Sequence, residues 1–441
     1  MKEKLSFTQL ISLSLMLFAL FFGAGNMIFP PAMGLSAGSH VWTALAGYIV
    51  TDVGLPLLAI TAVVFANRSL TTMVGRAGKK FSTFFIVLIY LLIGPLFAIP
   101  RTGSVSFELA VMPFLGESSH VSLYSVIFTA LFFGAVYVLS ANPNKIVAIV
   151  GKILTPILLL SIFIIGISAI VNPIGPVGQP VGTYGSIAFF NGIIEGYMAM
   201  DALAASIFAL IVIENVEAMG IQSQRNIAKY TLLTGILATI GLAVVYGILA
   251  YVGATSGSLG QFSNGGQLLA AVAHHLFGTI GMLILGIAVL FACLTTAIGL
   301  TTACGDYFSD NYTKLEYNHV IIAVCLFSFL VSNIGLTQLL NITLPALLMV
   351  YPVLMALVLA SFLNRWFQDR QPIYAGILIG AACVSIPNGL ESLAANYNIQ
   401  ITALSDLLQS IPFYQLGLGW VIPAIIGGII GAVVSAVHNK A

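Results

Sequence analysis

The stretch FFGAGNMIFPP, residues 21–31, interrupts a long apolar segment that begins near residue 7. Gly23, Gly25 and Asn26 are poor helix formers, and Pro30 and Pro31 follow closely. Backbone groups released at such a point are costly in hydrocarbon unless they face a cavity or a ligand. The stretch therefore predicts a helix broken in mid-membrane beside a cavity. The alternative is a continuous helix whose glycines pack against a neighbouring helix.

The composition around this stretch is that of an all-α polytopic membrane protein. Of the 441 residues, 59% are hydrophobic and 7% are charged, against about 25% charged in soluble domains. The apolar runs reach the ~20 residues that a transmembrane helix needs. A soluble enzyme, a nucleic-acid-binding protein and a disordered chain are excluded. With a net charge of +1, we expect membrane lipid and no nucleic acid among the partners.

Polar and Gly/Pro-rich breaks divide the chain into twelve candidate spans. Their approximate limits are 7–35, 41–66, 81–112, 121–140, 146–171, 187–215, 226–253, 278–308, 318–334, 337–364, 373–388 and 415–437. Twelve spans place both termini on one side, and the loops of that side hold every Lys and Arg except Arg101. By the positive-inside rule both termini are cytoplasmic. Residues 254–277 contain a short apolar helix, and residues 389–414 are expected to form a surface loop.

A second candidate break is EGYMAMD, residues 195–201. Glu195 and Asp201 are carboxylates within an apolar span, where ionisable residues are expensive and mark functional sites. We expect this helix to open at Gly196, with Glu195 near substrate or ion and Asp201 capping the second half-helix. The alternative is a span that starts later and leaves Glu195 near the outer interface.

The two breaks occupy corresponding places in an internal repeat. Gly25 lies in the first of five spans and Met198 in the sixth, while Pro156 in ILTPILLL corresponds to Pro345 in ITLPALLM. Repeats of five spans have opposite topology, because five is odd. We predict a first repeat over 7–171, a second, inverted repeat over 187–364 and two additional helices over 373–437. Paired broken helices in inverted repeats are typical of secondary transporters.

Further polar residues lie within the predicted spans. Thr295 and Thr296 offer hydroxyls that, with backbone carbonyls, suit Na⁺, although Thr in membrane helices commonly bonds its own backbone. Arg101 has Glu108 two turns away as a candidate partner, and Asp52 is also intramembrane. For Arg101 and Asp52 we favour a structural role.

Four motifs resemble the bacterial branched-chain amino acid:cation symporters of the amino acid–polyamine–cation superfamily. They are FFGAGNMIFPP (21–31), GPLFAIPRTGSVSFE (94–108), EGYMAMDALA (195–204) and LGLGWVIPAIIGG (416–428). The resemblance covers essentially the whole chain. It implies the five-plus-five inverted repeat of the leucine-transporter type, with discontinuous helices 1 and 6, in the bacterial cytoplasmic membrane.

The resemblance also implies site residues. Gly23, Gly25 and Asn26 match the broken-helix core of the leucine transporter. Its sodium site implies the carbonyls of Ala19, Phe22 and Ala292 and the hydroxyls of Thr295 and Thr296 as Na⁺ ligands. A second sodium site has no clear counterpart. The substrate ammonium and carboxylate are expected to bind at two stretches of backbone, Gly23, Ala24, Gly25 and Asn26, and Glu195, Gly196, Tyr197, Met198 and Ala199.

The leading hypothesis is cation-coupled symport of Leu, Ile and Val into the cell, with Na⁺ as the expected coupling ion and H⁺ as the other candidate. Apolar residues of spans 3, 6 and 8 would enclose the substrate side chain. The alternative within this class is a proton-coupled amino-acid permease, for which the carboxylates at 195–201 would argue. A channel is disfavoured by the lack of a charged ring lining a pore. An intramembrane enzyme is disfavoured because no catalytic motif is present.

Overall fold

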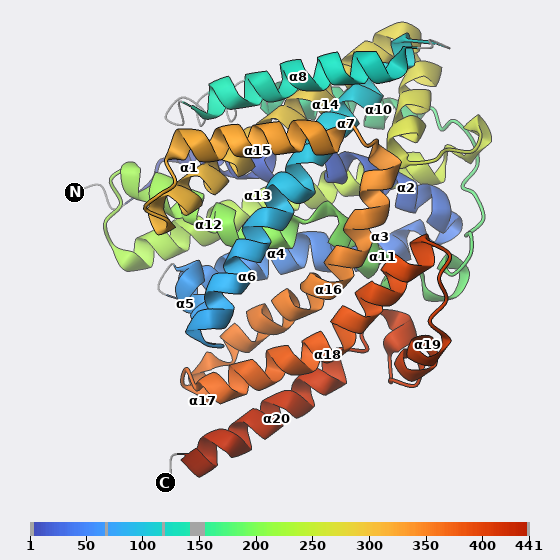
Figure 1. Ribbon diagram of the computed structural model, residues 1–441. Helices are drawn as coiled ribbons and strands as arrows, with labels where there is room; N and C mark the ends of the chain where they lie inside the picture. The colour runs from blue at the N-terminus through green and yellow to red at the C-terminus, as the bar shows by residue number, and fades with distance from the viewer. Residues whose placement is uncertain (1–3, 67–68, 117–119, 142–154, 439–441) are drawn as a thin grey trace.

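The computed structural model describes residues 4–66, 69–116, 120–141 and 155–438 (Figure 1). Within these ranges the chain is helical and contains no strand. Seven helices there are long and apolar enough to cross a membrane, or eight when a bent pair is taken as one span, and four shorter apolar helices accompany them. The all-helical membrane architecture predicted from the sequence is therefore confirmed.

The first predicted span is broken as expected. Helix α1 (Phe7–Phe21) ends two residues before α2 (Ala24–Ala37) begins, and Phe22 and Gly23 between them have non-helical backbone angles. The amide of Gly23 donates to the side chain of Asn26 at 3.1 Å. Pro30 and Pro31 lie inside α2 and do not end it. The break is thus formed by the glycine segment alone.

The second break exists, but Gly196 is not where the helix opens. Helix α11 (Tyr184–Ala199) and helix α12 (Asp201–Ala218) meet at an angle of 49°. The residue between them is Met200, which adopts the left-handed conformation with φ of 71°. Gly196 remains helical, and a Cβ there would lie 2.0 Å from the Thr51 hydroxyl. Gly196 therefore serves close packing and not unwinding.

The other helices largely follow the predicted spans. In chain order they are α3 (Val41–Ile49), the π-helical turn η2 (Val50–Gly54), α4 (Leu55–Phe65), α5 (Leu70–Gly75), α6 (Lys79–Leu91), η3 (Leu92–Leu96), α7 (Ala98–Ala110), α8 (Val121–Ser140), α10 (Thr155–Val171), α13 (Gln224–Ala254), α14 (Gly265–Asn311), α15 (Tyr317–Ser332), α16 (Leu336–Phe362), α17 (Asn364–Phe367), α18 (Gln371–Asn396), α19 (Thr402–Gln409) and α20 (Val421–His438). The first part of the predicted span 146–171 lies outside the described residues.

Two regions differ from the predicted boundaries. The short helix expected before residue 278 joins the following span in α14, with a kink at Gly278 where φ is +58°. Helix α18 passes Pro387 and extends to Asn396, and α19 follows where a loop was expected. Glu391 accepts hydrogen bonds from Ser405 and from Tyr414, the latter at 2.6 Å. These hydrogen bonds satisfy the carboxylate of Glu391, a residue that the sequence places in a surface loop.

Reciprocal glycines bring the helices around the breaks into backbone contact. A Cβ on Gly47 of α3 would lie 1.8 Å from the carbonyl oxygen of Phe189, and one on Gly192 of α11 would lie 1.9 Å from that of Ala44. A Cβ on Gly34 of α2 or on Gly253 of α13 would meet partner backbone at 2.0 Å in the same way. Small residues are the usual device for close helix packing in membranes.

Figure 1 shows how the helices are arranged. Helices α16, α18 and α20 form a layer along one side of the molecule, while α8 and α15 lie on the opposite side. The N-terminus and the C-terminus lie at the same end of the helices, together with the short helices α5 and α17. Helix α19 lies at the other end.

Candidate functional site

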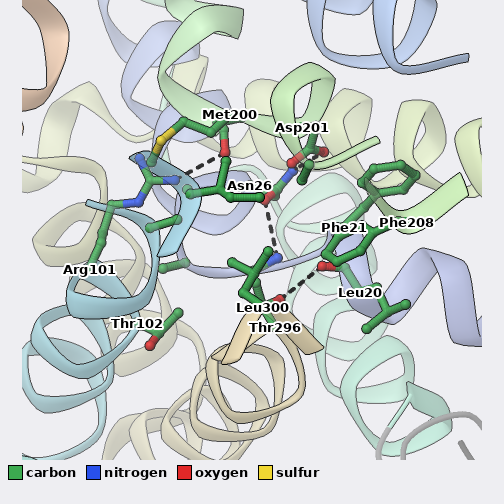
Figure 2. A pocket seen from close by; sticks show the side chains of 17 residues that line it. Leu20, Phe21, Asn26, Arg101, Thr102, Met200, Asp201, Phe208, Thr296 and Leu300 are labelled. Atoms are coloured by element: carbon green, nitrogen blue, oxygen red, sulfur yellow. Dashed lines mark hydrogen bonds between the residues drawn. The ribbon is translucent and has the colours of Figure 1, made fainter. Parts of the chain in front are cut away.

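A small cavity lies between the two helix breaks (Figure 2). Its volume is about 20 Å³, which is enough for one or two water molecules. The residues that line it are Leu20, Phe21, Gly23, Ala24, Gly25, Asn26, Ile93, Ala98, Arg101, Thr102, Ala199, Met200, Asp201, Ala204, Phe208, Thr296 and Leu300. Both breaks, α7 and α14 therefore contribute residues to the cavity. We call this arrangement, with its small cavity, the contracted state.

Asn26 connects the two breaks through its amide group. Its oxygen accepts from the backbone N–H of Gly23 at 3.1 Å, and its nitrogen donates to Asp201 at 2.7 Å and to the Tyr246 hydroxyl. The Tyr246 hydroxyl also donates to Asp201 at 3.3 Å. Figure 2 shows Asn26 between Arg101 on one side and Asp201 on the other. The start of α2 is thereby tied to the start of α12.

Arg101 of α7 binds the end of α11. Its guanidinium donates to the carbonyl oxygens of Met198 and Ala199, the latter at 3.0 Å, and lies 5.3 Å from the centre of the Phe29 ring. A cation at a helix C-terminus offsets the partial negative charge of the free carbonyls. Glu108, the candidate partner of Arg101, instead accepts from Asn264 at 2.7 Å and from Gln267 at 3.2 Å.

The oxygen atoms predicted for Na⁺ are largely brought together. The Thr295 hydroxyl donates to the carbonyl oxygens of Ala19 at 3.1 Å and Ala292 at 2.9 Å. The Thr296 hydroxyl lies 3.5 Å from the Ala19 carbonyl oxygen and 3.2 Å from that of Leu20. These contacts link four of the five expected oxygens near the end of α1. The fifth was expected to be the carbonyl oxygen of Phe22, whereas the α1 carbonyl beside Thr296 is that of Leu20.

These contacts fit a cation of the Na⁺ type. Both threonine hydroxyls reach across to carbonyls of α1, so they are not confined to their own helix as in the alternative interpretation. Carbonyl and hydroxyl oxygens are the ligands that hard cations prefer. The first break frees the α1 carbonyls at the point where α14 presents its hydroxyls.

The predicted substrate residues divide into two groups. Gly23, Ala24, Gly25, Asn26 and Ala199 line the cavity, while Glu195, Gly196, Tyr197 and Met198 are not among its lining residues.

The residues of the second group contact other parts of the structure. Glu195 accepts from the Tyr184 hydroxyl at 3.4 Å, and the Tyr197 ring stacks on Tyr351 with 4.6 Å between ring centres. Met198 contributes its carbonyl to Arg101. The shift of the break from Gly196 to Met200 explains this division, because the free helix end begins one turn later than expected.

Three polar residues at or beside the site were not predicted to act there. Arg101 is distinguishable in the sequence as the only basic residue outside the loops predicted to be cytoplasmic, and Asp52 as a carboxylate within a predicted span. Tyr246 carries no comparable signal, since a tyrosine in an apolar helix is ordinary. Its role follows only from its contact with Asn26 and Asp201.

Two broken helices that face each other across a buried polar cavity define a class of membrane transport proteins. The profile of the family described as "Branched-chain amino acid transport protein" matches residues 6–438. The chain belongs to this family. Because the family is one of transport proteins, the expectation that the chain is not an enzyme is confirmed.

Relatives of known name cover the whole chain. The branched-chain amino acid permease BraB of Bacillus subtilis is 43% identical, over 99% of this chain and 97% of its own length. Permease BrnQ of the same organism is 44% identical over the full length of both chains. A protein of Pseudomonas aeruginosa named as a branched-chain amino acid transport system 2 carrier is 38% identical, over 98% of this chain and 97% of its own length.

Solved structures share the fold. Mhp1, a transporter of the nucleobase-cation-symport-1 family, superimposes in its closed conformation with a TM-score of 0.62 at 16% identity, covering 97% of this chain and 93% of its own. A manganese transporter of Eremococcus coleocola gives a TM-score of 0.58 at 14% identity, covering 99% and 97%. The chain is thus a multi-pass membrane protein with the leucine-transporter type of fold.

Proposed function

We propose that the protein is a secondary active transporter that carries Leu, Ile and Val into the bacterial cell together with a cation. The observation that carries this proposal is the cavity between two broken helices, lined by the polar side chains of Asn26 and Asp201 together with apolar side chains. Membership of the transport family, and the names of its relatives, support the branched-chain substrates.

The polar side of the cavity suits a zwitterion. The first amides of α2, at Ala24 and Gly25, have no partner within the helix and carry partial positive charge, so they suit the substrate carboxylate. The carboxylate of Asp201 lines the same cavity and suits the substrate ammonium. The carbonyls at the end of α11 are engaged by Arg101. We therefore place the ammonium at Asp201 and not at residues 196–199.

The apolar side of the cavity comes from the three spans predicted to enclose the substrate side chain. Ile93 and Ala98 belong to span 3, Phe208 to span 6 and Leu300 to span 8. Burying about four methylene-sized groups at ~0.8 kcal/mol each would favour leucine over glycine by a few kcal/mol. Because the cavity is too small for leucine in this state, binding requires the lining helices to separate.

We propose Na⁺ as the coupling ion, at the oxygens of Ala19, Ala292, Thr295 and Thr296. In this position the ion would join the end of α1 to α14, next to the substrate cavity that Thr296 also lines. Ion binding would thereby favour the arrangement of α1 and α14 that binds substrate. The alternative of proton coupling remains a second candidate, because buried carboxylates lie beside the same cavity.

We further propose twelve membrane spans in two inverted repeats of five plus two additional helices, with both termini in the cytoplasm. The paired breaks, and the position of both termini at one end of the helices in Figure 1, support this topology. The proposed location is the bacterial cytoplasmic membrane, in contact with lipid.

Counterflow of labelled leucine in proteoliposomes tests the transporter class and its substrates. A transporter preloaded with unlabelled leucine draws labelled leucine inward transiently above equilibrium, whereas a channel does not. We expect external Ile and Val to compete and Gly not to compete. Monotonic, unsaturable entry of leucine would contradict the proposal.

A further inference from the structure

A buried carboxyl group outside the cavity lining has no assigned role in the sodium-coupled function proposed above. Asp52 is in η2, the π-helical turn between α3 and α4, and its exposed fraction is 0%. Neither of its carboxyl oxygens has a hydrogen-bond partner among the residues that the structure describes. A π-helical turn inside a helix is frequently found at a functional site, and an unpartnered intramembrane carboxylate requires an explanation.

Polar groups face Asp52 from several helices. The hydroxyls of Tyr48 on α3 and Tyr246 on α13 lie close enough to the Asp52 carboxyl group to favour its charged form. Neither hydroxyl meets the geometry of a hydrogen bond to its oxygens. The Tyr48 hydroxyl has no partner in the described part of the chain, and the rings of Tyr48 and Tyr246 meet edge to face at 5.2 Å. Tyr351 on α16 interacts electrostatically with Asp52. Glu195 on α11 interacts electrostatically with Tyr48.

Two charged groups complete these surroundings. Asp201 on α12 repels the Asp52 carboxylate, and Arg101 on α7 attracts it. Helix α4, which also adjoins η2, carries no titratable side chain. Asp201 and Tyr246 thus contact the cavity network on one side and face Asp52 on the other.

The charges of this group do not balance when both carboxyls are ionised. The carboxylates of Asp52 and Asp201 carry two negative charges, and the Arg101 guanidinium carries one positive charge. Its hydrogen bonds go to the backbone carbonyls of Met198 and Ala199. An ionised carboxylate buried without a donor or a cation is too costly to persist. One further positive charge must therefore reside at Asp52 in this state.

A proton fits this position better than a metal ion. Na⁺ needs a shell of several oxygens, and the oxygens proposed to supply one are those of Ala19, Ala292 and Thr295, on α1 and α14 and not on η2. A proton needs no additional space and can bind to one oxygen of a closely packed carboxyl group. Protonation also gives Asp52 an O–H donor that the neighbouring tyrosine hydroxyls can accept.

We propose that Asp52 binds a proton in the contracted state and is linked to the substrate site through Tyr246 and Asp201, so that leucine transport responds to pH through Asp52. The inference rests on the proposed function for its transport readout. Low pH favours the contracted state because that state holds the proton. Raising the pH removes the proton and slows the transport steps that pass through the contracted state. The rate of these steps falls by at most about tenfold per pH unit for a single proton.

Infrared spectroscopy and counterflow together test this proposal with the full-length protein. In the wild type we expect a carbonyl-stretch band of a protonated carboxylic acid that shifts when the protein is made with ¹³C-labelled aspartate. In Asp52→Asn, which resembles the protonated side chain, that band should be lost. Leucine counterflow at fixed Na⁺ should fall with rising pH in the wild type and stay nearly constant in Asp52→Asn.

Two controls define the outcome. Glu195→Gln and the exposed-site variant Asp406→Asn should both retain the aspartate band, and Asp406→Asn should retain the wild-type pH profile.

An unchanged band in Asp52→Asn, or an unchanged pH profile in this variant, would overturn the proposal. If Asp52→Asn does not fold, absence of the isotope shift in the wild type overturns it. Lack of leucine counterflow in the wild type would instead refute the proposed function, and the infrared result would still report on Asp52.

Discussion

Asn26 illustrates how one side chain can organise a site in which most partners are backbone. Its amide oxygen caps the start of α2, and its amide nitrogen reaches Asp201 at the start of α12. An amide supplies an acceptor and two donors at once, which neither Asp nor Ser does. The same residue therefore closes the first break and positions the carboxylate of the second.

The hydroxyls of Thr295 and Thr296 allow a direct test of the ion site. We expect Thr295→Ala and Thr296→Ala each to weaken Na⁺ binding by ~1–3 kcal/mol, since a hydrogen-bonding ligand is lost from a buried oxygen set. Sodium activation of leucine uptake measures this effect. Thr343→Ala is a matched control, because that buried hydroxyl bonds only the Leu339 carbonyl of its own helix at 2.7 Å in the described structure. Unchanged sodium activation in both site variants would refute the assignment.

The two carboxylates of the second break should differ in importance. Asp201 lines the cavity and bonds Asn26, whereas Glu195 bonds Tyr184 away from the cavity. We expect Asp201→Asn to reduce leucine counterflow by more than tenfold, corresponding to about 1.4 kcal/mol or more, and Glu195→Gln to retain most of it. Loss of transport in Glu195→Gln with retention in Asp201→Asn would reverse the assignment.

The residue types of the site were largely readable from the sequence, but their exact contacts were not. Gly23, Gly25 and Asn26 are unusual in an apolar span, so the first break was predictable. Met200 carries no such signal, although it adopts the left-handed conformation with φ of 71°. A glycine such as Gly196 predicts an opening of the helix, whereas in the structure it lies against the Thr51 hydroxyl.

At the scale of elements, the packing of α3 against α11 fixes the position of the second break. Gly47 and Gly192 bring the two backbones together, and the Thr51 hydroxyl donates to the Ile193 carbonyl at 3.0 Å. The same contact places η2, with Asp52, beside the end of α11. Helix periodicity in the sequence does not reveal which glycines face which helix, so this pairing was not predicted.

The substitution Gly47→Ala tests this packing. Its Cβ would lie 1.8 Å from the Phe189 carbonyl oxygen, so the helices must separate. We expect a destabilisation of ~1–3 kcal/mol, which is typical of overpacking, with a lower midpoint of thermal unfolding in detergent. Gly134→Ala in α8 is the matched control, because a Cβ at this position would meet nothing within 4 Å in the described structure. Equal unfolding midpoints in the two variants would contradict the packing argument.

At the scale of the whole molecule, hydrophobicity determines the class of fold, and charge asymmetry predicts its orientation. The length of the apolar runs predicts the positions of the spans. The observed helices differ most from the predicted spans at the start of α14, near Gly278, and at the end of α18, near Pro387. There the helices continue through Gly278 and Pro387, residues that mark a helix end in the sequence. The inverted repeat remains a prediction supported by the paired breaks.

Cysteine accessibility tests the proposed orientation. Cys383 is the exposed cysteine of the described chain and is replaced by Ser, after which Arg365→Cys in α17 or Asp406→Cys in α19 is introduced. A membrane-impermeant maleimide added to intact cells should label the site in α19 and not the site in α17. The reverse pattern would place the termini outside the cell.

Cation-driven accumulation of leucine tests the central claim most directly. Purified protein is placed in proteoliposomes, and uptake of labelled leucine is followed under an inward Na⁺ gradient at equal pH and clamped membrane potential. The proposed symport predicts accumulation of leucine above its external concentration, which collapses when the Na⁺ gradient is abolished. Uptake that only reaches equilibrium under this gradient, or that accumulates leucine solely with an imposed proton gradient, would contradict it.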